Sequence, residues 1–179
     1  MALPHAHPGE LAWSDIAGIR LAQLKGVRMH LKDEELVTGL AGQDGGPDLL
    51  AATFARVTTA VSFTRMLTPL GNYFIARPAA RAAASKITEE TDVPLDAAVV
   101  LGLSADALHV WSADPMLNQV NEYLGHVPLA RIAGIDAIPG RSWQKLTITL
   151  EGGHQIDLEG RGASHQLAAE FGRLTGAAR

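Results

Sequence analysis

The sequence contains no cysteine, which removes several kinds of chemistry at once. Disulfides, thiolate nucleophiles and zinc sites built on cysteine are excluded, and the composition is compatible with a reducing cytoplasm. Aromatic residues are scarce at 5% of the chain, and the 19 acidic residues outnumber the 15 basic ones. This balance does not support a surface that neutralises phosphates, so nucleic acid is not an expected partner.

Signatures of catalysis are missing as well. The chain has no HExxH, GxSxG, Walker or dinucleotide-binding glycine pattern. His5 and His7 form a pair, but zinc needs three or four ligands in fixed geometry and the nearby sequence does not supply them. We therefore expect no catalytic residue, no metal site and no cofactor, and an enzyme is the least favoured function.

The residues that are present indicate a folded protein. Hydrophobic residues make up 47% of the 179 positions and charged residues 19%, which is typical of globular chains. Residues 1–9 contain two prolines and lack the basic and apolar segments of a signal peptide, so we expect a flexible tail and a cytoplasmic location.

Residues 10–92 are predicted to be a helical N-terminal region. A short helix is expected after Asp33, which would act as its N-cap. A longer helix is predicted from Pro47, since apolar residues follow it at helical spacing. These residues are Leu50, Phe54, Val57 and Val61. A third helix follows Pro78, where alanine is abundant.

One part of this region raises the hypothesis of membrane contact. Residues 57–75 include Arg65, Pro69 and Asn72, so they are too polar for a full span. They also offer an apolar surface that could lie flat on a bilayer, formed by Phe63, Met66, Leu67, Leu70, Tyr73 and Phe74. The alternative is that this surface packs on the rest of the protein or on a second subunit.

Residues 93–179 are predicted to be rich in antiparallel strands, after a linker at residues 88–96. A hairpin is expected between residues 99–103 and 107–111. Residues 120–138 should hold one or two strands, with Pro128 at an end because proline cannot donate to a ladder.

A second hairpin is predicted around Gly152. A three-residue loop at residues 152–154 is preferred, because it pairs the apolar residues Leu150 and Ile156 on one face. In the same register Ile148 pairs with Leu158.

The chain should finish in an amphipathic helix. Ser164 is its expected cap and Gly176 its end. The buried stripe would consist of Leu167, Phe171 and Leu174.

Three phrases of this region, VVLGLSADALHVW, VPLARIAGIDA and LTITLEGGHQIDLEG, followed by the helix, resemble the small bacterial PH-like domains. The resemblance covers roughly residues 97–175. It implies an α+β fold with a PH-like antiparallel sheet or open barrel capped by a C-terminal helix, here preceded by the N-terminal helical region. Phosphoinositide-binding members are expected to carry cations in the first hairpin loop. Residues 103–107 carry only the carboxylate of Asp106, so phosphoinositide is not expected as a ligand.

Two groups of residues are candidates for binding. Arg131, Arg141, Trp143 and Lys145 form a basic and aromatic group suited to protein recognition. His109 and Trp111 share a strand face and could line a small-molecule pocket, although such pairs are more often packing residues.

The leading hypothesis is a non-catalytic interaction module that binds a protein, a peptide or another copy of itself through sheet edges or beside the C-terminal helix. Membrane anchoring through residues 57–75 and a small-molecule site are the alternatives.

Overall fold

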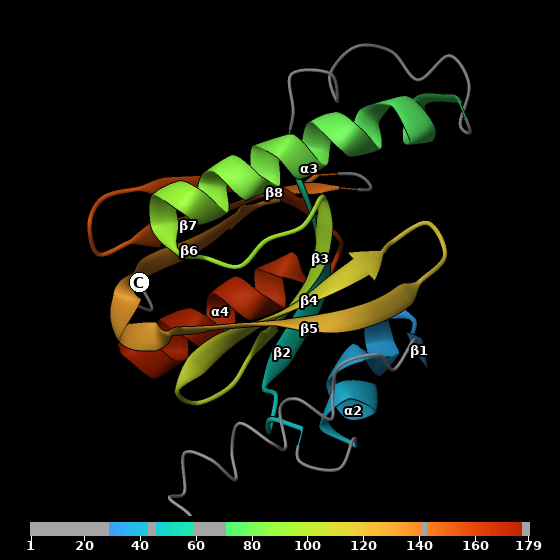
Figure 1. The fold of residues 1–179 in the computed structure, drawn as a ribbon. Coiled ribbons are helices and arrows are strands. Elements are labelled where there is room, and N and C mark those ends of the chain that lie inside the picture. Colours follow the sequence, from blue (N-terminus) through green and yellow to red (C-terminus); the bar gives the residue numbers. More distant parts are fainter. Residues whose placement is uncertain (1–28, 43–45, 59–70, 141–142, 177–179) are drawn as a thin grey trace, which may run out of the picture.

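The computed structural model describes residues 29–42, 46–58, 71–140 and 143–176. Within them the chain forms an eight-stranded antiparallel sheet and three α-helices, so the predicted α+β class is confirmed (Figure 1). The predicted tail at residues 1–9 lies outside the described residues.

The elements follow one another in a simple order along the chain. The strands are β1 Met29–His30, β2 Ala51–Val57, β3 Ala98–Leu103, β4 Ala107–Asp114, β5 Gln119–Pro128, β6 Ile132–Ile138, β7 Gln144–Leu150 and β8 Gln155–Gly160. The helices are α2 Leu36–Ala41, α3 Gly71–Thr91 and α4 Ser164–Thr175, with 3₁₀ turns η1 Asp33–Glu35 and η3 Leu129–Arg131. Across the sheet the order is β1-β5-β4-β3-β2-β8-β7-β6, which places β2 near the middle.

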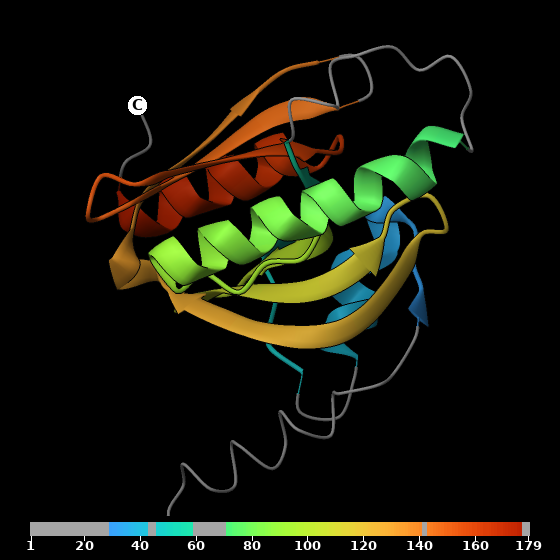
Figure 2. The same ribbon diagram turned by 45° about the horizontal axis from the view of Figure 1, so that its top comes forward.

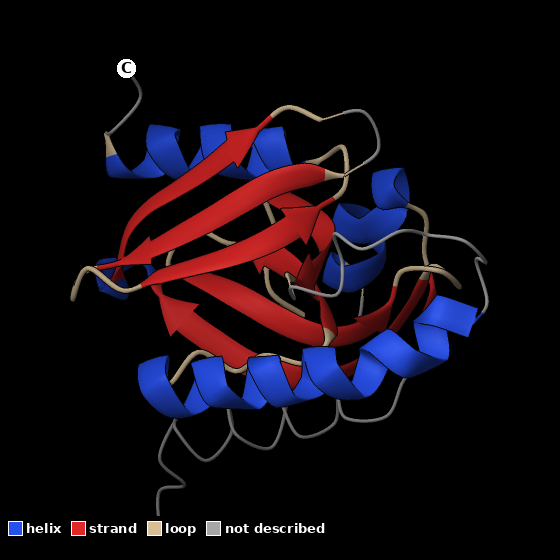
Figure 3. Ribbon diagram, turned by 90° about the horizontal axis from the view of Figure 1, so that it is seen from above, coloured by secondary structure: helices blue, strands red, loops and turns tan. Residues whose placement is uncertain are grey.

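The sheet curves so that its two faces enclose separate cores. On the inner side, Leu167 and Phe171 of α4 pack with Ala84 of α3 against strand residues such as Leu101 and Leu146. Figure 3 shows the strands between α4 and α3, which run along opposite sides in that view. The outer core lies under α2. Its members include Leu36, Leu40, Leu49, Phe54, Val100, Trp111, Val120 and Tyr123.

The prediction of a helix from Pro47 is wrong, because residues 51–57 form the strand β2. Along β2, Ala55 and Val57 face the inner core while Phe54 faces the outer one. A strand buried on both faces loses the alternation of apolar and polar residues, so helical spacing arose here by coincidence. β2 pairs with β3 and β8, so the sheet includes residues from both regions that the sequence separated at residue 93.

The other predicted helices of this region are confirmed, with different ends. After Asp33 the chain forms η1 and then α2. α3 includes the alanine-rich stretch after Pro78 and continues to Thr91, so the predicted linker at 88–96 is wrong for its first four residues. Asp92, at φ 56°, ends the helix in a left-handed conformation.

The predicted hairpin of β3 and β4 is confirmed, and its turn closes with a hydrogen bond from Ser104 N to Ala107 O (2.9 Å). Residues 120–138 contribute two strands, β5 and β6. Pro128 is the last residue of β5, as the missing donor requires.

The β7–β8 hairpin forms, but its predicted register is wrong by two residues. Ile148 pairs with Ile156, and Leu150 N donates to His154 O (2.9 Å), so the loop is residues 151–153. Gly153 supplies the positive φ (81°) that the turn needs. A shift of two keeps every side chain on its face, so alternation alone could not distinguish the two registers.

α4 buries the predicted stripe, with Leu167 and Phe171 in the inner core and Leu174 packed at its margin. Gly176 ends the helix at φ 71°, as predicted. Ser164 is the first helical residue and not the cap: its hydroxyl donates to Arg161 O (2.7 Å).

Candidate binding surfaces

Trp111, which the sequence suggests as a pocket wall, is a residue of the outer core. It is 3% exposed and packs edge-on against Tyr123, with ring centroids 5.3 Å apart. A Cβ added at Gly102 on the neighbouring strand would lie 2.9 Å from Trp111 Cζ3, so the glycine leaves room for the indole ring. Its ring is therefore already covered.

His109 has hydrogen-bond partners at both ring nitrogens. Nδ1 lies 3.0 Å from Tyr123 Oη, and Nε2 lies 3.1 Å from Ser104 Oγ. Because the Ser104 hydroxyl donates to Asp106 Oδ1 (2.7 Å), the network assigns the proton to Nε2 and lets Nδ1 accept from Tyr123. The chain of contacts reaches the surface at Asp106 and at His126, whose Nδ1 is 3.5 Å from Tyr123 Oη.

Burial determines the protonation states of the residues in this hydrogen-bond network. Burial lowers the pKa of His109 to about 4 and raises the pKa of Tyr123 to about 12, so both side chains are neutral at pH 7. The hydrogen bond from Ser104 lowers the pKa of Asp106. With both of its nitrogens engaged, His109 has no polar atom to spare for a ligand.

The three described members of the group of Arg131, Arg141, Trp143 and Lys145 each contact residues outside the group. Arg131 Nη2 donates to Thr91 O (2.8 Å), and Lys145 pairs with Asp157 (3.2 Å). Arg141 lies outside the described residues. Trp143 is contacted by other cations, since the guanidinium carbons of Arg56 and Arg161 lie 4.2 Å and 5.7 Å from its ring centroid.

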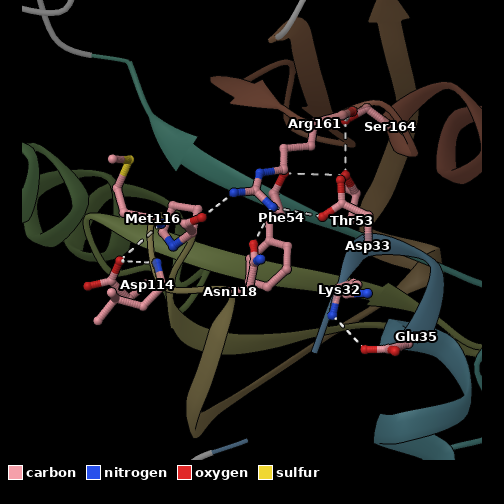
Figure 4. A network of polar contacts seen from close by, with 12 residues as sticks. Lys32, Asp33, Glu35, Thr53, Phe54, Asp114, Met116, Asn118, Arg161 and Ser164 are labelled. Atoms are coloured by element: carbon pink, nitrogen blue, oxygen red, sulfur yellow. Dashed lines mark hydrogen bonds and ion pairs between the residues drawn. The ribbon is translucent and has the colours of Figure 1, made fainter. Parts of the chain in front are cut away.

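Arg161 joins three segments that are distant in the sequence (Figure 4). Its Nη1 donates to Asp33 Oδ1 (2.9 Å) and to Asn118 Oδ1 (2.7 Å), and its Nη2 donates to Pro115 O. The guanidinium carbon lies 4.9 Å from the ring centroid of Phe54. Arg161 therefore fixes the β4–β5 turn and η1 against the middle of the sheet.

The β4–β5 turn, residues 115–118, carries two exposed apolar side chains. Met116 is 61% exposed and Leu117 is 60% exposed. Asp114 accepts from the backbone N–H groups of both, at 3.1 Å and 3.3 Å. The turn thus holds its backbone in place while its side chains face solvent.

A cavity of about 220 Å³ lies where the end of α3 meets η3 and the β7–β8 loop. Its charged and titratable lining residues are Glu90, Asp92, Arg131, Glu151 and His154. Three carboxylates and one guanidinium are among its lining groups, so the lining carries a net negative charge.

β6 ends the strand order, so one of its edges has no neighbouring strand among the described residues. It is seven residues long, whereas β1 at the opposite end has two. Ile132 and Ile135 are buried, while Ile138 is 60% exposed. α4 contacts β6 from the inner side.

The membrane hypothesis rests on residues that are mostly outside the described ones. Phe63, Met66, Leu67 and Leu70 lie outside them, and so do the side chains of Tyr73 and Phe74 at the start of α3. No helix within the described ranges has the length and apolar character needed to cross a bilayer. Those ranges also contain no group of three His, Asp or Glu residues placed to hold a metal ion.

Sequence reasoning missed Arg161 and the exposed apolar pair of the β4–β5 turn, although Pro115 and Asn118 do predict a connection there. Arg161 lies between two glycines after a strand, a pattern with no motif of its own. Met116 and Leu117 form an apolar pair that a sequence cannot distinguish from buried residues, because the turn that exposes them depends on partners distant in the chain.

No protein-family model matches the chain, and no curated protein matches it.

Proposed function

We propose that this protein is a non-catalytic cytoplasmic module that binds an extended segment of a partner protein along the edge of β6 that has no neighbouring strand among the described residues. The observation that carries the proposal is the position of β6 as a seven-residue strand at the end of the sheet. Edge strands present unpaired N–H and C=O groups, and an extended peptide can add to them as a further strand.

A PH-like domain is the fold we propose for the sheet and its helix. Support comes from the antiparallel sheet followed by α4, and from β2, which pairs with β8 and extends this layout toward the N-terminus. Phosphoinositide remains an unexpected ligand, since the β3–β4 turn carries Asp106 and no cation.

The charge on β6 favours a partner segment over a second copy of this chain. Asp136 is exposed near the middle of the strand. Antiparallel pairing of two β6 strands in a register centred near Asp136 would bring two Asp136 side chains close together, and like charges across strands are destabilising. A partner with Lys or Arg near this position would be attracted instead.

A small-molecule site at His109 and Trp111 is less well supported, because one residue is core and the other has both nitrogens bonded.

The test is selection of peptides from a random displayed library against the full chain. We expect binders with alternating apolar residues and one Lys or Arg, and slower hydrogen exchange of the amides of residues 132–138 in the complex. Asp136→Lys should weaken binding at least tenfold, whereas Glu89→Lys, the same charge change on exposed α3, should not.

Binders that leave the β6 amides unprotected, or that bind Asp136→Lys equally well, would refute the proposal. If the chain sediments as a dimer and the β6 amides exchange slowly without peptide, the strand that adds to β6 is a second copy of this chain and not a partner segment.

A further inference from the structure

Hydrogen bonds within the β4–β5 turn fix the shape of its backbone. Asp114 accepts from Met116 N (3.1 Å) and Leu117 N (3.3 Å), and Asn118 adopts a left-handed φ of 50°. Non-glycine residues enter that region at some energetic cost. The turn is therefore held in a defined shape from within.

The same turn is also held by two other segments. Arg161 donates to Pro115 O and to Asn118 Oδ1 (2.7 Å). Leu31 N donates to Asn118 O (2.8 Å), and His30 Nδ1 lies 3.3 Å from Leu117 O. These contacts satisfy polar groups of the turn within the protein, so no backbone group contacted here needs water.

The apolar side chains point away from this support. In Figure 4, Met116 extends away from Arg161. Met116 and Leu117 are 61% and 60% exposed, which makes them the two most exposed large apolar residues in this part of the sheet and adjacent in sequence. A rigid turn with two exposed apolar tips is arranged for insertion into an apolar phase.

The size and shape of the tip favour lipid over protein. A stable protein interface takes about 800 Å² and about 20–30 residues from each partner. Two side chains at a convex tip provide far less, and a protein partner would need a matching pocket. The fluid layer beneath lipid headgroups closes around a convex tip without one, and gains from each apolar group buried.

The surroundings of the turn agree with this orientation. Arg77 of α3 lies 3.9 Å from Asp114, so the start of α3 and the turn are at the same end of the molecule, as Figures 1 and 2 both show. Because Arg77 is paired with Asp114, the tip depends on its apolar side chains and not on charge for contact with lipid.

We propose that Met116 and Leu117, at the tip of the β4–β5 turn, insert into a lipid bilayer and dock this end of the protein on a membrane surface. The contact is weak and reversible, because two side chains bury little more than a short acyl segment. It is independent of the β6 edge, so either proposal stands without the other.

The experiment is co-sedimentation of the full chain with two kinds of vesicle. One is pure phosphatidylcholine, and the other contains about 30% phosphatidylglycerol as an anionic lipid. We expect similar binding to both, because the apolar side chains and not a cation make the contact. Met116→Ser and Leu117→Ser should each lower the partition coefficient about tenfold. Ile138→Ser is the matched control: Ile138 is 60% exposed but lies on β6, and its loss should leave partitioning unchanged.

Leu117→Trp adds a direct readout. Its extra fluorescence, taken as the difference from the wild-type spectrum, should shift to shorter wavelength when vesicles are added. Absence of vesicle binding by the wild type, an unshifted spectrum, or equal losses in Ile138→Ser would each overturn the proposal. A lower melting temperature for the two Ser variants would overturn it too, since it would show that the tip is covered within the protein.

Discussion

Arg161 Nη1 donates to Asp33 Oδ1 at 2.9 Å, across 128 positions of sequence. The Arg161 side chain is 23% exposed and Asp33 is 31% exposed, so the pair is partly shielded from water. Because the same guanidinium also reaches the β4–β5 turn, one side chain links the first described helical turn, a strand connection and the segment before α4.

Replacing this side chain should destabilise the protein. Arg161→Met would leave Asp33 and Asn118 without their partner, and we expect a loss of about 2–3 kcal/mol in the free energy of unfolding. Urea denaturation measures it. Arg173→Met is the control, because the exposed Arg173–Glu170 pair should contribute less than about 0.5 kcal/mol. Equal losses in the two variants would contradict the role given to Arg161.

The position of β2 predicts a large effect at Phe54. Phe54 is 0% exposed in the outer core, so Phe54→Ala should cost about 3–5 kcal/mol. Leu50→Ala, at a position that is 42% exposed and just before β2, should cost less than about 1 kcal/mol. Similar costs would indicate that the two residues lie on one buried helical face, as their spacing suggested.

The wrong prediction for β2 shows which elements of the fold can be predicted from sequence patterns. The β7–β8 hairpin with its alternating residues, and α4 with its single apolar stripe, were predictable because each buries one face. The β3–β4 hairpin was predictable because turn residues separate its two apolar runs. β2 buries both faces, and its two neighbours come from distant parts of the chain. The binding surfaces were less predictable still. Trp143 contacts Arg56 and Arg161 only because β2 and β8 pair in the observed register. Arg131 and Lys145, which are close to Trp143 in the sequence, bind Thr91 and Asp157 instead.

Stability should depend on pH through His109. Its pKa is about 4 in the folded protein and about 6.5 when unfolded, so between these values the unfolded chain binds more protons. Stability is therefore full above pH 6.5 and falls as the pH drops toward 4. We expect about 2 kcal/mol, after allowance for the partial exposure of the ring.

Comparison with His109→Gln isolates this contribution. The amide can donate and accept as the imidazole does, but it does not titrate in this range. Urea denaturation between pH 7 and pH 4 should give a smaller slope for the variant. A slope equal to that of the wild type would show that His109 does not cause the loss.

The β7–β8 loop provides a test of register. Gly153 has a φ of 81°, so Gly153→Ala should cost about 1 kcal/mol although its Cβ would meet open space. At Gly152 an added Cβ would lie 3.6 Å from His154 Cδ2, an ordinary contact, and Gly152→Ala should be nearly neutral. If the order of the two costs is reversed, the loop does not consist of residues 151–153.

The pairing of β2 with β8 has a consequence for how the protein is made. Ala55 pairs with Gly160, so β2, near the middle of the sheet, gains one of its two neighbouring strands only after β8 has been synthesised. Contacts between such distant segments form slowly, and a nascent chain meanwhile presents an unpaired strand edge. Folding of the sheet should therefore finish only after β8 has been synthesised, and chains that stop before Gly160 should aggregate.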